Sequence, residues 1–296
     1  MVILHIAYVV NDKANGVSVV VSRYVREQSK SQEVALLNIS DEVIKDKANN
    51  LLIFNNYDSN KSILEQLEEP FNKPDIVIFH EIYRYKFIKM YKELLSNNIP
   101  YIIIPHGSLN KVAQRKGKIK KIVGNVLLFK SFVKNASKVQ FLTEKEKNMS
   151  LKYNNNCYVL GNGMDILDKS TSCVNKEKRK FTFIYIGRFD IKVKGIDMLL
   201  RACKLNYQFM KKNNMVIEFY GKNSGKKDGR KYISNYIKKN ELSETVKLKS
   251  EIYDEEKIEK ILESNIFIQT SRNEGQPLSL LEALGYGIPV IVTPRH

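Results

Sequence analysis

Short apolar runs alternate with longer amphipathic stretches along most of the chain. The short runs are rich in β-branched residues and apolar throughout, as is typical of parallel strands that are covered on both faces. In the first half the pattern predicts strands over 2–10, 34–39, 51–54, 76–79, 101–104, 138–142 and 157–160, and helices over 17–30, 61–67, 85–96 and 120–135. Strands that alternate with helices in this way predict a doubly wound parallel α/β sheet.

The pattern stops between Asp168 and Lys180, where Lys, Ser, Thr and Asn dominate, as is typical of a linker. It then predicts strands over 181–186, 215–220, 246–248, 266–269 and 289–292, and helices over 198–211, 231–239, 255–263 and 277–284. We therefore predict an α/β domain over residues 1–165, a linker over 166–180 and a second α/β domain over 181–296. The second domain is expected to be incomplete, because a sheet of this type usually continues beyond the last predicted strand.

Charge and composition narrow the possible partners. Hydrophobic residues make up 43% of the 296-residue chain, which argues against global disorder. The net charge of +17 favours an acidic partner: nucleic acid, an anionic membrane surface or a phosphorylated substrate. The basic stretches 111–121 and 222–239 carry no signature of a nucleic-acid-binding module, so no nucleic acid is expected. Stretch 111–121 can instead face anionic lipid or a lipid-diphosphate acceptor, whereas 222–239 is mostly a solvated helix face.

The cysteines and the amino terminus indicate a location in the cell. Cys157, Cys173 and Cys203 are widely spaced and belong to no Cys/His cluster, which favours a reducing compartment and argues against structural zinc. A buried first strand explains the amino terminus better than a signal peptide does. No apolar run approaches the roughly 20 residues that span a bilayer. We expect a cytoplasmic protein, soluble or peripheral on the inner face of the membrane.

Two loops of the first domain hold candidate binding residues. Gly16 lies between the first strand and the first helix, where it allows backbone N–H groups to approach a phosphate, although an ordinary tight loop explains it equally well. His106 follows the strand over 101–104. It suits a hydrogen bond to a substrate hydroxyl or a proton transfer, and a structural histidine bonded to a backbone carbonyl is the equal alternative. The glycine-containing turn over 161–165 is a candidate hinge.

The second domain holds a cationic loop and a pair of carboxylates. Arg188 and Lys194 share one loop after a predicted strand, and together they can bind a diphosphate, although such side chains are merely solvated in most loops. Glu274 lies in a later loop and Glu282 within the helix that follows it. The two carboxylates therefore bracket a helix N-terminus, a place that favours phosphate. A surface helix with two solvated glutamates is the alternative.

Local signals define the ends of that helix. Pro277 suits its first position, where a missing N–H costs nothing, and Gly285 or Gly287 can end it in a left-handed conformation. The sequence has no Walker A lysine motif, dinucleotide glycine fingerprint, Gly-x-Ser-x-Gly elbow or His-Glu-x-x-His. It also has no Asp-x-Asp pair, so we expect no metal and no cofactor. Fixed protein charges would then neutralise a bound diphosphate.

These motifs together resemble the retaining glycosyltransferases of family 4, the group 1 enzymes of GT-B type. The most specific part of the resemblance is Gly-Arg…Lys-Gly at 187–195, followed by Ser-Arg-Asn-Glu-Gly-Gln-Pro at 271–277 and a second glutamate at 282. The latter looks like the Glu-x7-Glu motif of the family. Asn-Gly-Met-Asp at 162–165 and Pro-His-Gly-Ser-Leu at 105–109 also resemble family segments. The resemblance implies two Rossmann-like domains that face each other across a cleft.

The resemblance also implies roles for residues. Arg188 and Lys194 would bind the donor diphosphate and stabilise the departing nucleoside diphosphate, Glu274 would contact the sugar hydroxyls, and Glu282 the ribose. His106 would contact the donor sugar or the acceptor. The other implied donor-site positions are Gly16, Gly187, Gly275, Gln276, Pro277 and Leu278. The family often has an aromatic residue where this chain has Gln276, and it usually continues with helices that cross back onto the first domain.

Three hypotheses follow. The first is a metal-independent hexosyltransferase-type enzyme that uses a nucleotide-sugar donor and a glycan or lipid-diphosphate-linked acceptor to build a surface polysaccharide such as a capsule. The second is an inactive, truncated GT-B shell that binds anionic membranes or polyanions. The third, a sugar-nucleotide epimerase, fits the Glu-x7-Glu and Gly-Arg…Lys-Gly motifs less well.

Overall fold

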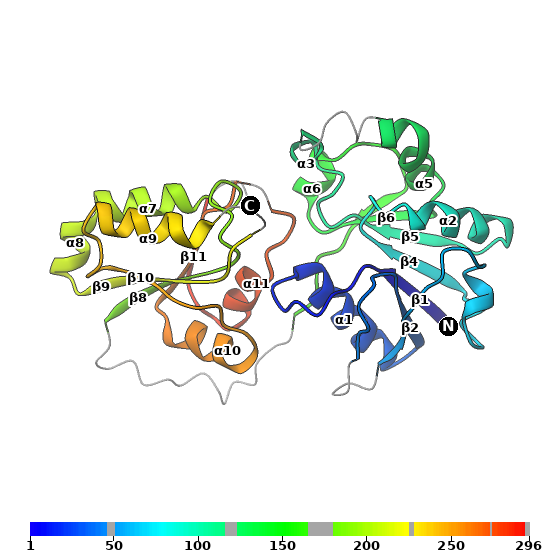
Figure 1. Cartoon of the computed structure of the whole chain (residues 1–296), viewed down its shortest axis with the longest axis horizontal. Coiled ribbons are helices and arrows are strands. Elements are labelled where there is room, and N and C mark those ends of the chain that lie inside the picture. The colour runs from blue at the N-terminus through cyan, green and yellow to red at the C-terminus, as the bar shows by residue number, and fades with distance from the viewer. Residues whose placement is uncertain (46–50, 116–122, 165–179, 225–227, 273, 294–296) are drawn as a thin grey trace. The chain divides into compact units, whose positions relative to one another are not determined.

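The computed structural model describes residues 1–45, 51–115, 123–164, 180–224, 228–272 and 274–293 of the chain (Figure 1). The chain divides into two compact units, Met1–Gly163 and Met164–His296. Apart from Lys180, the predicted linker lies outside the described residues, as do Cys173 and Asp165.

The amino-terminal unit contains a seven-stranded, wholly parallel sheet in the order β3-β2-β1-β4-β5-β6-β7. The order reverses between β1 and β4, and open α/β sheets bind ligands beyond the carboxyl ends of the strands at such a point. The strands are β1 (Val2–Ala7), β2 (Glu33–Asn38), β3 (Leu52–Phe54), β4 (Ile76–His80), β5 (Tyr101–Ile104), β6 (Lys138–Phe141) and β7 (Cys157–Val159).

Helices cover both faces of this sheet, so each face has its own core. Val21 and Val25 of α1 pack on one face, and Phe87 of α2 and Phe132 of α5 pack on the other. The helices are α1 (Gly16–Ser29), the 3₁₀ turn η1 (Leu64–Gln66), α2 (Lys86–Ser96), α3 (Lys111–Arg115), the π-helix η2 (Asn125–Phe129), α5 (Lys130–Lys134) and α6 (Glu144–Met149).

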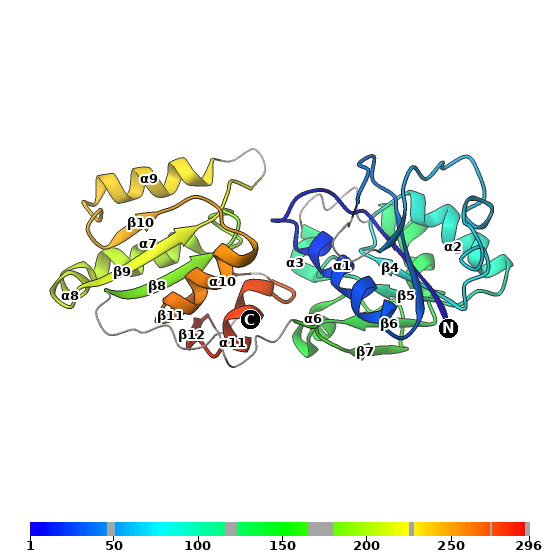
Figure 2. The same cartoon turned by 90° about the horizontal axis from the view of Figure 1, so that it is seen from below.

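The carboxy-terminal unit contains a five-stranded parallel sheet in the order β10-β9-β8-β11-β12. Figures 1 and 2 show α7 and α9 on one side of this sheet and α10 and α11 on the other. The strands are β8 (Phe181–Ile186), β9 (Met215–Tyr220), β10 (Val246–Leu248), β11 (Ile266–Gln269) and β12 (Val290–Val292). The helices are α7 (Ile196–Leu205), α8 (Tyr207–Lys212), α9 (Gly229–Lys239), α10 (Asp254–Glu263) and α11 (Leu278–Gly285).

The predicted α/β class is confirmed in both units, whereas several predicted element ends are wrong. The first strand ends at Ala7 and not at residue 10, because side chains take the next backbone donors: Val9 N–H donates to Asn38 Oδ1 at 3.0 Å and Val10 N–H to Ser18 Oγ at 3.1 Å. The predicted helix over 198–211 is two helices that meet at Asn206.

Two other predicted helices also differ from the structure. The helix over 61–67 is reduced to the turn η1, where the Glu93 carboxylate accepts hydrogen bonds from the N–H groups of Ile63 and Leu64. The described part of the helix over 120–135 begins with residues 123–124 in α-helical conformation, which are followed by the π-helix η2 and by α5. Two short helices, α3 and α6, were not predicted.

Candidate functional site

In the carboxy-terminal unit, the loop after β8 and the loop after β11 are bonded to each other. Thr270 Oγ1 donates to the carbonyl oxygens of Lys194 and Gly195 at 3.1 and 3.2 Å. Arg272 N–H donates to the carbonyl of Val193 at 2.8 Å. Gly195 has a left-handed φ of 67°, and a Cβ atom at this position would lie 2.0 Å from the Thr270 carbonyl oxygen. Only glycine therefore permits this approach.

An ion pair reinforces the junction between the two loops. The Arg272 guanidinium binds both carboxylate oxygens of Asp197 in the first turn of α7, at 2.6 and 3.2 Å. Lys192 Nζ also donates to Asp197, at 2.7 Å. Burial raises the pKa of Asp197, but the hydrogen bonds from Arg272 and Lys192 outweigh it and leave the pKa below its ordinary value. Asp197 is therefore an anion that fixes Arg272, and with it the start of the β11–α11 loop.

Lys194 and Glu274 meet at this junction. Lys194 Nζ forms an ion pair with Glu274 Oε1, and the two side chains are only 14% and 16% exposed. Ser271 Oγ donates to the same Glu274 oxygen at 3.1 Å and Gln269 Nε2 lies 3.5 Å from it. The structure thus brings together a cation and a carboxylate that the sequence assigned to one site from positions 80 residues apart.

Glu282 lies on the buried face of α11 and is only 6% exposed. Its carboxylate forms an ion pair with Lys257 of α10, whose side chain is 19% exposed. The alternative in which Glu274 and Glu282 are solvated surface glutamates is therefore wrong. Lys257 was not singled out from the sequence, because it lies in an amphipathic helix in which lysines and glutamates alternate, so nothing distinguishes it from a solvated lysine.

Helix α11 begins one residue later than predicted. Pro277 is the N-cap with an extended ψ of 118°, and the helix starts at Leu278. At the other end Gly287, with a φ of 73°, takes the left-handed conformation, whereas Gly285 is still helical. Gly287 N–H donates to the Leu284 carbonyl and Ile288 N–H to the Ala283 carbonyl, which is a Schellman motif.

Gly187 and Arg188 follow β8 directly, and the Arg188 side chain is exposed. The buried Tyr185 hydroxyl donates to the Arg188 carbonyl at 3.3 Å and so fixes the backbone of this loop. Burial, and to a smaller extent the charge of Glu274, raises the pKa of Tyr185 well above its ordinary value. Tyr185 is therefore bonded to the Arg188 loop and lies near enough to Glu274 to sense its charge. The segment 275–278, which holds the other predicted donor-site residues, is partly buried.

In the amino-terminal unit, Gly16 is the exposed first residue of α1 and begins that helix at the carboxyl end of β1. The side chain of Asn15 caps the helix by accepting hydrogen bonds from Val17 N–H and Ser18 N–H at 3.1 and 3.2 Å. The Asn15 side chain thus satisfies two of the free helix N–H groups that a phosphate would otherwise bind.

His106 lies at the carboxyl end of β5 in a tight turn. His106 and Gly107 have left-handed φ values of 49° and 80°, and Ser108 N–H donates to the Pro105 carbonyl at 3.0 Å. Buried Glu146 anchors this turn, because its carboxylate accepts hydrogen bonds from Gly107 N–H at 2.6 Å and from Leu142 N–H at 2.8 Å. A non-glycine residue in this strained conformation is held by its surroundings and is typical of functional sites.

His106 is the last of three histidines joined ring to ring. His5 Nδ1 lies 2.9 Å from His80 Nε2, and His80 Nδ1 lies 3.0 Å from His106 Nε2. Burial lowers the pKa of His5 and His106 to about 4 and that of His80 well below its ordinary value, so all three are neutral at pH 7. The alternative in which His106 is bonded to a backbone carbonyl is not what the structure shows.

Comparison with known proteins gives a family and a fold. Residues 169–296 match the family model of glycosyl transferases group 1. The carboxy-terminal unit is therefore similar to the group 1 glycosyltransferases. No curated protein sequence shows significant similarity to the chain.

Similar solved structures extend over both units. Sucrose-phosphate synthase from Thermosynechococcus elongatus has 16% identity and a TM-score of 0.69, over 99% of this chain and 82% of that one. HepE from Anabaena in complex with UDP has 16% identity and a TM-score of 0.72, over 99% and 80%. The lipopolysaccharide outer core galactosyltransferase WaaB has 18% identity and a TM-score of 0.66, over 100% and 82%. The chain therefore has a GT-B-type fold of two Rossmann-like domains.

Each unit also holds residues near the predicted ones that the sequence alone did not reveal. Arg272, Asp197 and Lys257 hold the predicted donor-site residues in place. At the carboxyl end of β4, Glu81 has a left-handed φ of 70° and binds Arg84, at 2.6 Å, and the Arg84 guanidinium lies 4.0 Å from the centre of the Tyr8 ring. The sequence held one signal for Glu81 and Arg84, which is that they follow the strand predicted over 76–79.

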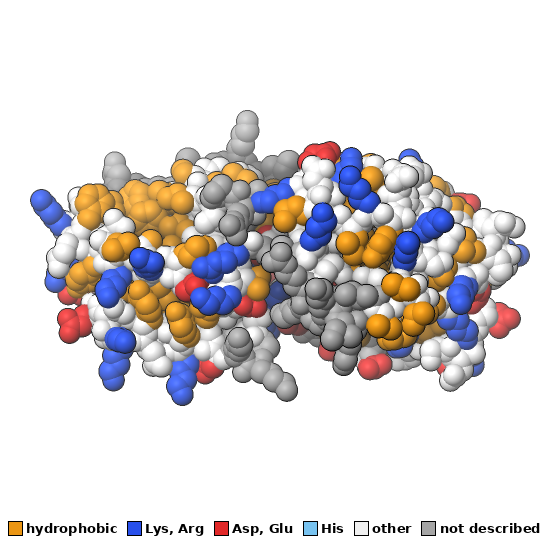
Figure 3. All heavy atoms as spheres, turned by 90° about the horizontal axis from the view of Figure 1, so that it is seen from above, with side chains coloured by type: hydrophobic (Ala, Val, Ile, Leu, Met, Phe, Trp, Pro, Cys, Tyr) orange, Lys and Arg blue, Asp and Glu red, His pale blue; other side chains and the backbone are white. Residues whose placement is uncertain are grey.

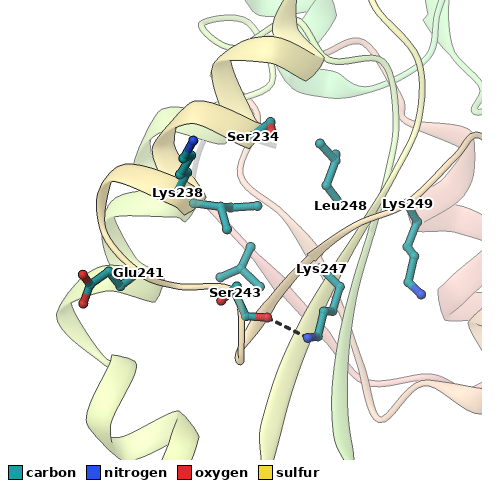
Figure 4. Close-up of a pocket in the computed structure, with 9 residues that line it drawn as sticks. Ser234, Lys238, Glu241, Ser243, Lys247, Leu248 and Lys249 are labelled. Carbon is teal, nitrogen blue, oxygen red and sulfur yellow. Dashed lines mark hydrogen bonds between the residues drawn. The ribbon is translucent and has the colours of Figure 1, made fainter.

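A separate hollow in the carboxy-terminal unit lies between α9 and the edge strand β10. Its volume is about 520 Å³, and Lys238, Lys247 and Lys249 are among the residues that line it (Figure 4). Lys247 Nζ donates to the Ser243 carbonyl at 2.6 Å. None of the predicted donor-site residues lines it, so it is separate from the Lys194–Glu274 junction.

Proposed function

We propose that this group 1 glycosyltransferase moves a hexose from a nucleotide-sugar donor to a glycan or lipid-diphosphate-linked acceptor, with retention of anomeric configuration and without a metal ion. The Lys194–Glu274 ion pair beside the start of α11 carries the proposal. A cation that can neutralise a leaving diphosphate and a carboxylate that can accept hydrogen bonds from sugar hydroxyls lie together before any ligand binds. Such preorganised charge lowers the barrier to departure of the nucleoside diphosphate.

Each residue has a role in this proposal. Lys194 and exposed Arg188 bind the diphosphate, Glu274 and residues 275–278 contact the sugar, and Glu282 binds the ribose once a ligand competes with Lys257. Gly16 allows backbone N–H groups to approach the phosphates, and His106 contacts the donor sugar or the acceptor. Because fixed cations neutralise the diphosphate, the reaction needs no metal. Retention follows if the acceptor attacks from the face that the phosphate leaves, which requires no carboxylate nucleophile.

The solved structures support a nucleotide-sugar donor. HepE has been solved with UDP-glucose and with UDP and glucose. TarM from S. aureus, 20% identical over 73% of this chain with a TM-score of 0.50, was solved with UDP and a GlcNAc-glycerol. We propose that the acceptor belongs to a surface polysaccharide such as a capsule and that the enzyme works in the cytoplasm, peripherally on the inner face of the membrane. Among the described residues, no helix is long and apolar enough to span a membrane.

Donor binding and turnover test this function. The full chain is incubated with UDP-, GDP- and ADP-sugars in the presence of EDTA, and thermal unfolding, release of nucleotide and the anomeric configuration of the product are measured. We expect one nucleotide class to raise the melting temperature and to be consumed with retention. If none of them stabilises the protein, the proposal is wrong. Turnover that needs a divalent ion would overturn metal independence alone.

Two variants separate the roles at the junction. Lys194→Met removes a charge-assisted hydrogen bond worth about 1.5–3 kcal/mol, so the Kd for UDP should rise by roughly tenfold or more. Glu274→Gln should weaken the binding of the nucleotide-sugar but not of UDP, because only the sugar contact is lost. Lys204→Met, at an exposed site on α7, is the matched control and should leave both affinities unchanged. Equal effects of Lys194→Met and Lys204→Met on UDP would contradict the assignment.

A further inference from the structure

A line of hydrogen bonds connects α1 to the His106 turn. It begins at Gln28, whose Oε1 lies 2.7 Å from His5 Nε2, and continues through His80 to His106 Nε2. His5 and His80 each use both ring nitrogens in this line. Among the described residues, His106 has a partner only at Nε2, so Nδ1 is the nitrogen that remains for a ligand. The three rings lie on one face of the sheet, in or directly after the adjacent strands β1, β4 and β5.

The direction of every hydrogen bond in the line follows from Gln28. An amide oxygen only accepts, so His5 Nε2 must carry the proton of its ring. A neutral imidazole has one N–H, which leaves His5 Nδ1 as an acceptor and makes His80 Nε2 the donor. The same step repeated makes His106 Nε2 the donor to His80 Nδ1. Burial supports the neutral form of all three rings, since each pKa lies far below 7.

We propose that Gln28, His5 and His80 are positioning residues that hold His106 in its Nε2–H tautomer, so that His106 Nδ1 accepts a hydrogen bond from a hydroxyl group of the bound substrate. The tautomer rests on the geometry alone, whereas the hydroxyl ligand rests on the proposed function. At pH 7 this His106 accepts a hydrogen bond and does not donate one from Nδ1. The hydrogen-bond donation considered for His106 from the sequence is thereby restricted to Nε2, which is already used.

The surroundings hold both the ring and the backbone of His106. The ring is bonded to His80, and the backbone has a left-handed φ of 49° in a turn that Glu146 anchors through Gly107. Tyr24 of α1 adds ring contacts at centroid distances of 6.4 Å to His5 and 5.8 Å to His80. A histidine with only a structural role needs one such partner. Here His5 and His80 are buried, and partly buried His106 at the end of the line is the only one of the three with a ring nitrogen that has no partner among the described residues.

Imidazole ¹⁵N NMR tests the tautomer without any substrate. The full chain contains only four histidines, so the His5, His80 and His106 signals can be assigned by single substitutions. At pH 7.5 we expect all three to be neutral Nε2–H tautomers, with His106 Nδ1 unprotonated. A protonated Nδ1 on neutral His106 in the wild-type protein would overturn the proposal, whatever the activity of the enzyme.

Gln28→Lys should reverse the direction of every hydrogen bond in the line. A lysine ammonium only donates, so His5 Nε2 becomes an acceptor and each following ring switches to the Nδ1–H tautomer. Gln28→Glu keeps an acceptor and should keep the wild-type tautomers. Ser29→Lys places the same charge on the neighbouring exposed position of α1 and is the matched control. A His106 tautomer that is the same in Gln28→Lys as in the wild-type protein would contradict the proposal.

Ligand binding then tests the hydroxyl contact. If a UDP-sugar binds the wild-type protein, its Kd should rise by about tenfold in Gln28→Lys, because His106 Nδ1–H would face a hydroxyl that has lost its acceptor. The Kd for UDP alone and both constants in Ser29→Lys should stay unchanged. A reversed tautomer with unchanged affinity for the UDP-sugar would overturn the hydroxyl contact. Failure of every UDP-sugar to bind the wild-type protein would count against the proposed function, and the NMR spectra would still decide the tautomer.

Discussion

At the scale of single residues, the buried histidines couple stability to pH. His5 and His106 have a folded-state pKa of about 4, whereas an unfolded histidine has a pKa of about 6.5. Between these values the unfolded chain binds more protons, so the unfolding free energy falls as the pH falls through 6.5. Each histidine contributes up to about 1.4 kcal/mol per pH unit to this slope. Urea unfolding followed by circular dichroism at pH 7.5, 6.5 and 5.5 should show the loss.

A substitution isolates the histidine contribution from that of the carboxylates. His5→Gln keeps hydrogen-bonding groups next to Gln28 and His80 but removes one titrating ring. The slope between pH 6.5 and 5.5 should decrease by about 1 kcal/mol per pH unit, because an unfolded histidine goes from half to about nine-tenths protonated in this range while folded His5 stays neutral. An unchanged slope would show that His5 does not lose a proton on folding.

The same residues show what could be predicted from the sequence and what could not. His106 was found because a histidine directly after a buried strand lies where α/β sheets bind ligands. His5 and His80 were missed, although each is a polar residue within or next to an apolar run. Their roles depend on strand order, which brings β1, β4 and β5 together from positions 75 and 26 residues apart. Sequence spacing carries no such information.

At the scale of elements, the approach of the β8–α7 loop to the β11–α11 loop depends on Gly195. Gly195→Ala would place a Cβ 2.0 Å from the Thr270 carbonyl, in a conformation that costs an L-residue about 1–2 kcal/mol before any clash. We expect a loss of more than about 2 kcal/mol in unfolding free energy and a weaker affinity for the nucleotide, because the Lys194–Glu274 pair must separate. Urea unfolding and UDP titration measure the two effects.

Gly287→Ala is the matched control for this prediction. Gly287 has a similar φ of 73°, but nothing lies within 4 Å of the position of its Cβ. Gly287→Ala should therefore lower the unfolding free energy only by the cost of the left-handed conformation, about 1–2 kcal/mol, and leave UDP binding unchanged. If the two variants lose equal stability, the contact between Gly195 and Thr270 does not decide the position of the loop.

Strands were predicted more accurately than helices, for physical reasons. A buried parallel strand is apolar throughout, and such runs are visible in the sequence. The ends of elements were set by individual side chains, such as Asn38 and Ser18 after β1 and Glu93 at η1, whose partners lie 8 to 30 residues away in sequence. Helix α6 did carry a local signal, since Thr143 and Glu146 have the spacing of a capping box. The Glu146 carboxylate, however, bonds to Leu142 and Gly107 and not to its own N-cap.

At the scale of the whole molecule, the net charge of +17 predicts a surface that binds an anionic partner. Figure 3 shows basic side chains scattered among hydrophobic ones over one face of the protein. In the amino-terminal unit, the helical segment 123–134 exposes an apolar and basic stripe, defined by Val123, Val126, Leu127, Lys130 and Lys134. Val126 and Leu127 are 71% and 69% exposed, so neither side chain packs into the core. Adjacent apolar side chains with this exposure are unusual on a protein surface. The combination suits the surface of an anionic membrane.

Vesicle binding tests this stripe as the membrane contact of the proposed enzyme. The full chain should cosediment with phosphatidylglycerol vesicles, less so at high salt, and only weakly with phosphatidylcholine vesicles, because Lys130 and Lys134 need anionic headgroups. Val126→Ser combined with Leu127→Ser removes apolar area worth more than about 1.4 kcal/mol, so binding should weaken by at least roughly tenfold. Stability should hardly change, since both side chains are exposed. Leu205→Ser combined with Phe209→Ser, at exposed apolar sites on α7 and α8, is the matched control. Equal losses in the two double variants, or equal binding to both lipids, would show that the stripe is not the contact and that the charge acts elsewhere.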